Sequence, residues 1–213
     1  MAHSEQSLRT AAVECYRNAT NLHRSAEILY RAHRLEHALA LARIGIEEFA
    51  KLVVYTVAAL CPGDRDRVRG KIGGHHTKSW VFSQVRDCMM KLRQTERGFT
   101  LVECFTDLAK LGLSGLLLTD REAREQYVQR NEGRLNPAEL KDDALYVDLT
   151  VDGTLRVPRA VGRLGFFAEL YVALLSNHLR QFAELPDWLT NDHDWNAFAN
   201  GVRCRIDGVR GRR

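Results

Sequence analysis

The sequence has few of the features that direct a protein to a membrane or to export. Its longest apolar run, residues 52–60, is much shorter than the roughly 20 apolar residues that a membrane-spanning helix requires. The N-terminal segment MAHSEQSLRTAAVE is polar and charged where a secretory signal would carry an apolar core. We therefore expect a cytoplasmic protein that makes no contact with a membrane.

Cysteine pairs and zinc motifs are also missing. The five cysteines are odd in number and form no Cys-x-x-Cys pair, which argues against a disulfide framework and a cysteine-rich zinc site. The HExxH spacing of helical zinc sites is absent as well. We expect reduced thiols, no metal and no other cofactor.

The chain has only a small excess of positive charge, with a formal net charge of +4. This value alone does not establish nucleic-acid binding. Arginine is nevertheless clustered, in GDRDRVRGK at 63–71 and in a basic C-terminal tail at about 203–213. Such runs are typical of solvated segments, and they also suit contacts with phosphates.

Apolar residues recur mostly at helical spacing. The predicted helices cover residues 6–31, 38–57, 75–94, 100–118, 120–130, 159–185 and 187–200, with Pro186 as the break before the last. No internal repeat or low-complexity linker divides the chain. We therefore predict a single domain over residues 1–213.

One segment changes to a period of two. The sequence ALYVDLTVDGTLRVP alternates apolar and polar residues around a central Asp152-Gly153 pair, which favours a β-hairpin. The predicted fold is therefore an all-α helical bundle with one small β-hairpin near residues 145–157.

The second predicted helix carries charge in an otherwise apolar field, ALALARIGIEEFAKLVV. Arg43, Glu47 and Lys51 follow one another at i to i+4 spacing and so share one face, with Glu48 rotated by one residue. Buried charges are costly unless they are paired. The set therefore indicates either a salt-bridge ladder that fixes helix packing or part of a functional site.

Partners for a functional site follow the Gly73-Gly74 pair, where His75, His76 and Lys78 open the next predicted helix. Histidine exchanges protons near neutral pH, and a cation stabilises a charged phosphorane. A helix N-terminus also favours a phosphate. These residue types are the ingredients for cutting RNA without a metal.

We assign the candidate roles as follows. The candidate catalytic residues are His75, His76, Glu48, Lys51 and Lys78; the candidate binding residues are Arg43, Glu47 and Arg69. Either histidine serves as acid or base, and Glu48 holds the histidine tautomer or takes the base role itself. The two lysines hold the phosphate.

The run SAEILYRAHRLEHALALARIGIEEFAK, the later HHTKSW and the segment ALYVDLTVDGTLRVPR together resemble the abortive infection V (AbiV) family of the HEPN superfamily. The resemblance covers most of residues 25–159, in the family's order. It implies a HEPN-like bundle, a role in phage defence through RNA or translation, and a homodimer. The chain departs from the usual HEPN ribonuclease motif, because three glycines separate Arg69 from His75.

Three functions remain open on these grounds. The first is a dimeric toxin, a metal-independent endoribonuclease that attacks RNA linked to translation and answers to a phage-encoded activator or a cognate antitoxin. The second is a non-catalytic module that senses a phage protein or blocks translation by occupancy. The third is a nucleotide-binding pocket with Lys51 and Lys78 on the phosphates.

Overall fold

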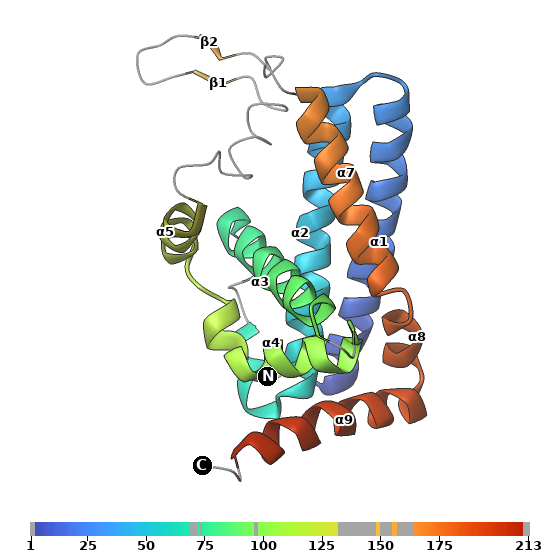
Figure 1. The fold of residues 1–213 in the computed structure, drawn as a ribbon, viewed down its shortest axis with the longest axis vertical. Coiled ribbons are helices and arrows are strands. Elements are labelled where there is room, and N and C mark those ends of the chain that lie inside the picture. The colour runs from blue at the N-terminus through green and yellow to red at the C-terminus, as the bar shows by residue number, and fades with distance from the viewer. Residues whose placement is uncertain are drawn as a thin grey trace.

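The computed structural model describes residues 3–68, 72, 74–95, 98–131, 148–149, 155–156 and 164–210. Figure 1 shows these residues as a helical assembly. Its elements are α1 (Glu5–Arg31), α2 (Leu35–Leu60), the 3-10 helix η1 (Pro62–Val68), α3 (His75–Arg93), α4 (Leu101–Leu116), α5 (Asp120–Asn131), β1 (Asp148–Leu149), β2 (Leu155–Arg156), α7 (Leu164–Gln181), α8 (Leu185–Thr190) and α9 (Asp192–Arg210).

Helix α2 is the centre of the fold. It runs beside α1 and α7 along the long axis, while α3 lies obliquely beside its middle and α4 and α9 cross the lower end of this group (Figure 1). Because most of its side chains are apolar, α2 buries nearly its whole surface. Gly45 permits the close approach of α7, since a Cβ there would lie 2.5 Å from Leu175 Cδ2.

An aromatic cluster joins the crossing helices to α2. Phe49 packs edge-on against Phe182 with ring centroids 4.9 Å apart, and Phe105 lies 5.8 Å from the same ring. Phe198 of α9 continues the cluster at 5.5 Å from Phe105. These edge-to-face contacts tie α2, α4 and α9 into one core.

The helical part of the prediction is confirmed for α1 through α5 and for α7, with shifts at the ends. Near the C-terminus the predicted break is displaced, because α7 ends at Gln181 and Pro186 lies in the first turn of α8. A proline is tolerated there because its missing N–H would have no helical partner. A second break, which the sequence did not predict, comes at Asn191, whose side chain accepts a hydrogen bond from the backbone N–H of His193 at 2.9 Å.

The segment predicted as a basic tail at 203–213 is helical as far as Arg210. Val202 is buried and Ile206 packs against the core, so the apolar stripe of α9 continues into the arginine-rich stretch. This stripe explains why a segment that reads as a solvated tail extends the helix instead.

The predicted hairpin near 145–157 is represented by a two-residue pairing. Strands β1 and β2 pair antiparallel, with Asp148 opposite Arg156 and Leu149 opposite Leu155. The turn expected at Asp152-Gly153 lies outside the described residues and stays a prediction. The fold that the structure describes is therefore essentially helical.

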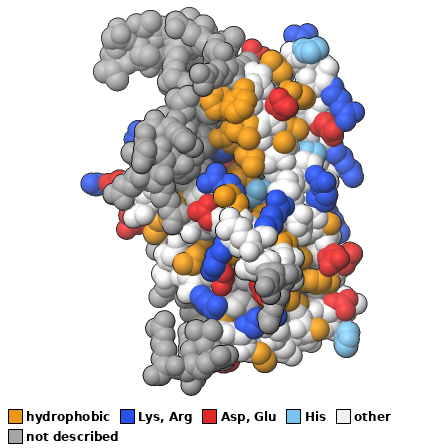
Figure 2. Space-filling model, viewed as in Figure 1, with side chains coloured by type: hydrophobic (Ala, Val, Ile, Leu, Met, Phe, Trp, Pro, Cys, Tyr) orange, Lys and Arg blue, Asp and Glu red, His pale blue; other side chains and the backbone are white. Residues whose placement is uncertain are grey.

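Two surface properties complete the description. On the face shown in Figure 2, hydrophobic side chains gather near the N-terminal half of α7, where Phe166 is 60% exposed. No helix in the described part of the chain is both long and apolar enough to cross a membrane.

Candidate functional site

The start of α3 is fixed by a carboxylate from another helix. Asp120 Oδ1 accepts hydrogen bonds from the Thr77 backbone N–H at 3.1 Å and from the Thr77 hydroxyl at 3.0 Å. Gly74 leaves room for this carboxylate at the helix cap, because a Cβ there would lie 1.8 Å from the same oxygen in its present position. A carboxylate therefore already occupies the helix terminus at which a phosphate could have bound.

Glu47 is the centre of the cluster. Both of its carboxylate oxygens lie 2.9 Å from His75 Nδ1, and Oε2 lies 3.4 Å from Lys78 Nζ. The Glu47 and Lys78 side chains are 6% and 9% exposed, whereas the His75 side chain is 51% exposed. A buried carboxylate thus holds an imidazole that a large ligand can reach.

The contact with Glu47 also selects the His75 tautomer. A carboxylate only accepts hydrogen bonds, so Nδ1 carries the proton that lies between the two groups. In the neutral ring Nε2 is then the basic nitrogen. This is the arrangement by which a carboxylate orients a histidine for proton transfer.

A second polar chain fixes the backbone of His75. The buried Arg43 donates from Nη2 to Ser79 Oγ at 3.0 Å, and this hydroxyl donates to the His75 carbonyl at 3.0 Å. The Arg43 guanidinium also lies 5.0 Å from the centroid of the Tyr171 ring, a cation–π contact. Arg43 therefore joins α2, α3 and α7 beneath the histidine.

Glu48 and Lys51 lie on another side of α2. Lys51 Nζ pairs with Glu48 Oε1 at 2.5 Å. Burial, together with the charge of Glu48, raises the pKa of the Cys15 thiol on α1 to about 12. This side of α2 thus faces α1 and keeps an inert, protonated thiol.

The predicted candidates are thereby divided. The structure brings together Arg43, Glu47, His75 and Lys78. The sequence favoured Glu48 as the residue that orients the histidine. In the structure Glu47 contacts His75 instead, because neighbouring positions on a helix point about 100° apart. His76 is half-buried in the first turn of α3, and Arg69 lies outside the described residues.

Three contributors to the site were not anticipated. Ser79 could have been found from the sequence, because it follows His75 by four residues on the same helix face. Tyr171 and Asp120 come from helices far away in the chain, and no local pattern marks them.

The chemistry of this cluster does not suit a metal. Within the described ranges, no group of three or more histidine, cysteine or acidic residues could hold a metal ion. The Glu47 and His75 pair is also flanked by the cations of Arg43 and Lys78, which would repel a metal ion. The arrangement suits proton transfer beside an anionic substrate.

The fold and the site define an all-helical protein with a buried glutamate that holds a histidine and a lysine. A family model described as AbiV, of the HEPN type, matches residues 7–173. The chain therefore belongs to the AbiV family of the HEPN superfamily, which points to abortive infection, a form of phage defence. Neither the curated proteins nor the solved structures contain a match.

Proposed function

We propose that this chain is an abortive-infection toxin that cleaves RNA without a metal. The observation that carries the proposal is the Glu47–His75–Lys78 cluster, in which a buried carboxylate holds a half-exposed imidazole beside a buried cation. The same residues lie within the stretch that matches the family model.

The proposed reaction is an internal transesterification. His75 Nε2 takes the proton of a ribose 2'-hydroxyl, and the 2'-oxygen attacks the adjacent phosphorus. The bond from phosphorus to the 5'-oxygen breaks, which leaves a 2',3'-cyclic phosphate. The departing 5'-oxygen takes up a proton, which solvent water can supply.

Each neighbour of His75 has a defined part in this scheme. Glu47 stabilises the imidazolium that forms when His75 accepts the proton. Lys78 adds positive potential from a buried position, where its effect is screened less by water than at the surface. Of the buried charges at Arg43, Glu47 and Lys78, two are positive, which favours a phosphate near His75.

The partners of this activity are proposals as well. We infer RNA linked to translation as the substrate and a second copy of the chain as the dimer partner, as the family resemblance implies. A phage-encoded activator or a cognate antitoxin would control such a toxin. Arg69 and the arginines of α9 would then contribute salt-sensitive RNA contacts.

The test is incubation of the purified chain with total bacterial RNA in the presence of EDTA. Wild type should cleave and leave 2',3'-cyclic phosphate ends, while His75→Ala should not. Glu48→Gln is the matched control for Glu47→Gln, because it makes the same change one residue further along α2. Equal losses in both glutamine variants, or cleavage by His75→Ala, would contradict the assignment.

A second function is favoured by the packing of the same groups. Arg43, Ser79 and Tyr171 brace α2, α3 and α7, which is also what a non-catalytic binding module would need. Expression in cells separates the two functions. Growth arrest by a His75→Ala variant that folds normally would favour a binding module that blocks translation by occupancy.

A further inference from the structure

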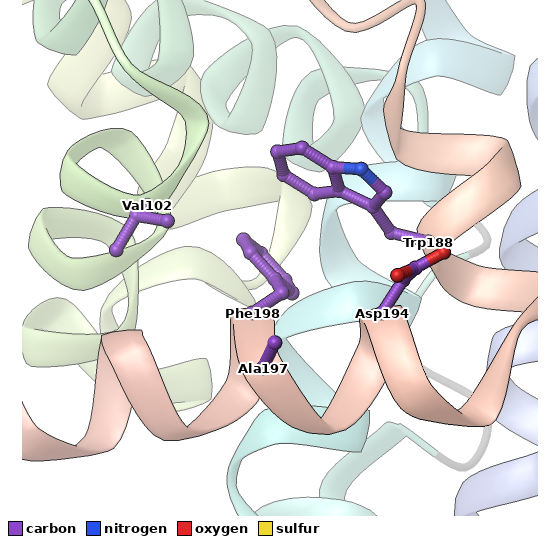
Figure 3. Close-up of a pocket in the computed structure, with 5 residues that line it drawn as sticks. All are labelled: Val102, Trp188, Asp194, Ala197 and Phe198. Atoms are coloured by element: carbon purple, nitrogen blue, oxygen red, sulfur yellow. The ribbon is translucent and has the colours of Figure 1, made fainter.

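A hollow of about 330 Å³ opens on the surface between α4, α8 and α9 (Figure 3). Its lining consists of Val102, Trp188, Asp194, Ala197 and Phe198. None of these residues belongs to the cluster around Glu47. The hollow is therefore a separate feature of the molecule.

Two aromatic rings shape this hollow. The Trp188 and Phe198 rings are 5.3 Å apart between centroids and inclined by 41°. Phe198 is buried and held by contacts with Phe105 and Trp195, so it forms a rigid floor. Trp188 is only half-buried and presents a wall to a ligand.

Asp194 supplies a carboxylate at the rim, drawn beside Trp188 in Figure 3. Among the residues that the structure describes, no cation or hydrogen-bond donor pairs with this carboxylate. Asp192, two residues earlier, shows the contrast, since it pairs with Arg9 Nη1 at 2.7 Å. The hollow therefore combines an aromatic wall with a negative charge that has no partner in the described chain.

We propose that this hollow binds an arginine side chain presented by a basic segment of a partner protein. A guanidinium can stack on the Trp188 ring while it pairs with the Asp194 carboxylate, and its aliphatic stem can lie on Phe198. The two attractive contacts reinforce each other because they act on the same charged group.

The surroundings favour a polypeptide over a free small cation. A second hollow of about 370 Å³ shares Val102 and Trp188 with the first and adds polar groups from Thr100, Arg180 and Glu184. The two adjoining hollows can accommodate residues on either side of the arginine. The chain's own Arg203 cannot enter, because it lies nine residues, or about 14 Å, further along the same helix.

The indole N–H signals of the three tryptophans provide a direct test. Trp80 donates to the Gly115 carbonyl at 2.9 Å and does not line the hollow, whereas Trp195 donates to Glu5 at 2.7 Å and packs against Phe198, the floor of the hollow. In protein labelled with ¹⁵N-tryptophan, titration with the peptide acetyl-Gly-Arg-Gly-amide should shift the Trp188 signal saturably. An unchanged Trp80 signal reports that the fold is intact.

Variants and probes define the outcomes. We expect a dissociation constant of about 1 mM, and at least about tenfold weaker binding for the citrulline peptide and for Asp194→Asn. Asp207→Asn, an exposed change on the same helix but outside the hollow, should bind as wild type does. Equal binding of the citrulline peptide, tighter binding of spermidine, or no shift of Trp188 would overturn the proposal.

Discussion

Two neighbouring glutamates on α2 have acquired different surroundings. Glu47 turns towards α3 and holds His75 and Lys78, whereas Glu48 turns towards α1 and pairs with Lys51. Both carboxylates are mostly buried and both have a cationic neighbour. The His75 side chain is 51% exposed and the Lys51 side chain 27%, so the partner of Glu47 is the more accessible of the two.

The largest expected difference between the two glutamates is in catalysis. Glu47→Gln should lower the RNA cleavage rate by about 100-fold or more, because the amide no longer stabilises the protonated imidazole. Glu48→Gln should change the rate by less than about threefold. Single-turnover cleavage assays measure the rates of both variants directly. A comparable loss of rate in Glu48→Gln would contradict the predicted difference between the two glutamates.

The comparison extends to a histidine that is buried instead of accessible. Burial lowers the pKa of His178 to about 4, and the nearby Arg86 and Arg93 act in the same direction. Because the unfolded histidine binds a proton near pH 6.5, stability should fall as the pH drops below that value, by about 3 kcal/mol at pH 4.

Urea unfolding at pH 7 and pH 4 measures this loss, and His178→Phe supplies the comparison. The free energy of unfolding should differ between the two pH values by about 3 kcal/mol less in His178→Phe than in wild type. The variant should still fold, since phenylalanine suits the neighbouring Phe49 and Phe82 rings. An unchanged pH dependence in His178→Phe would assign the acid sensitivity to other groups.

The Glu47 side also depends on a close contact at the start of α3. Gly74→Ala should destabilise the fold by about 2 kcal/mol, because the added Cβ would overlap the Asp120 carboxylate. Gly63→Ala is the control, since a Cβ there meets nothing within 4 Å. Chemical unfolding should therefore give a lower midpoint for Gly74→Ala than for Gly63→Ala. Equal midpoints would show that Asp120 moves aside without cost.

The smallest expected effect is on the Glu48 side. The ion pair between Glu48 and Lys51 is partly exposed, so Lys51→Met should change the free energy of unfolding by about 0.5 kcal/mol. The same variant should leave RNA cleavage unchanged. A large loss of cleavage in Lys51→Met would instead support the catalytic role that the sequence suggested for Lys51.

The sequence was sufficient to predict the long helices, because α1 and α2 each carry an uninterrupted helical pattern. It could not decide between Glu47 and Glu48, since both follow the same apolar run and only the packing of α3 distinguishes them. The capping of α3 by Asp120 was equally hidden, because the contact joins residues 43 positions apart. The extension of α9 was missed because its arginines masked the stripe made by Val202 and Ile206.

The contact between Asp120 and the start of α3 also bears on the order in which the chain is made. Glu47 and His75 emerge early in synthesis, but the carboxylate that fixes α3 follows later, and Tyr171, which stacks on Arg43, later still. A nascent chain therefore carries the reactive residues before it can hold them in place. Under the proposed function, the cluster would therefore be assembled only after the last helix that contributes to it has been made.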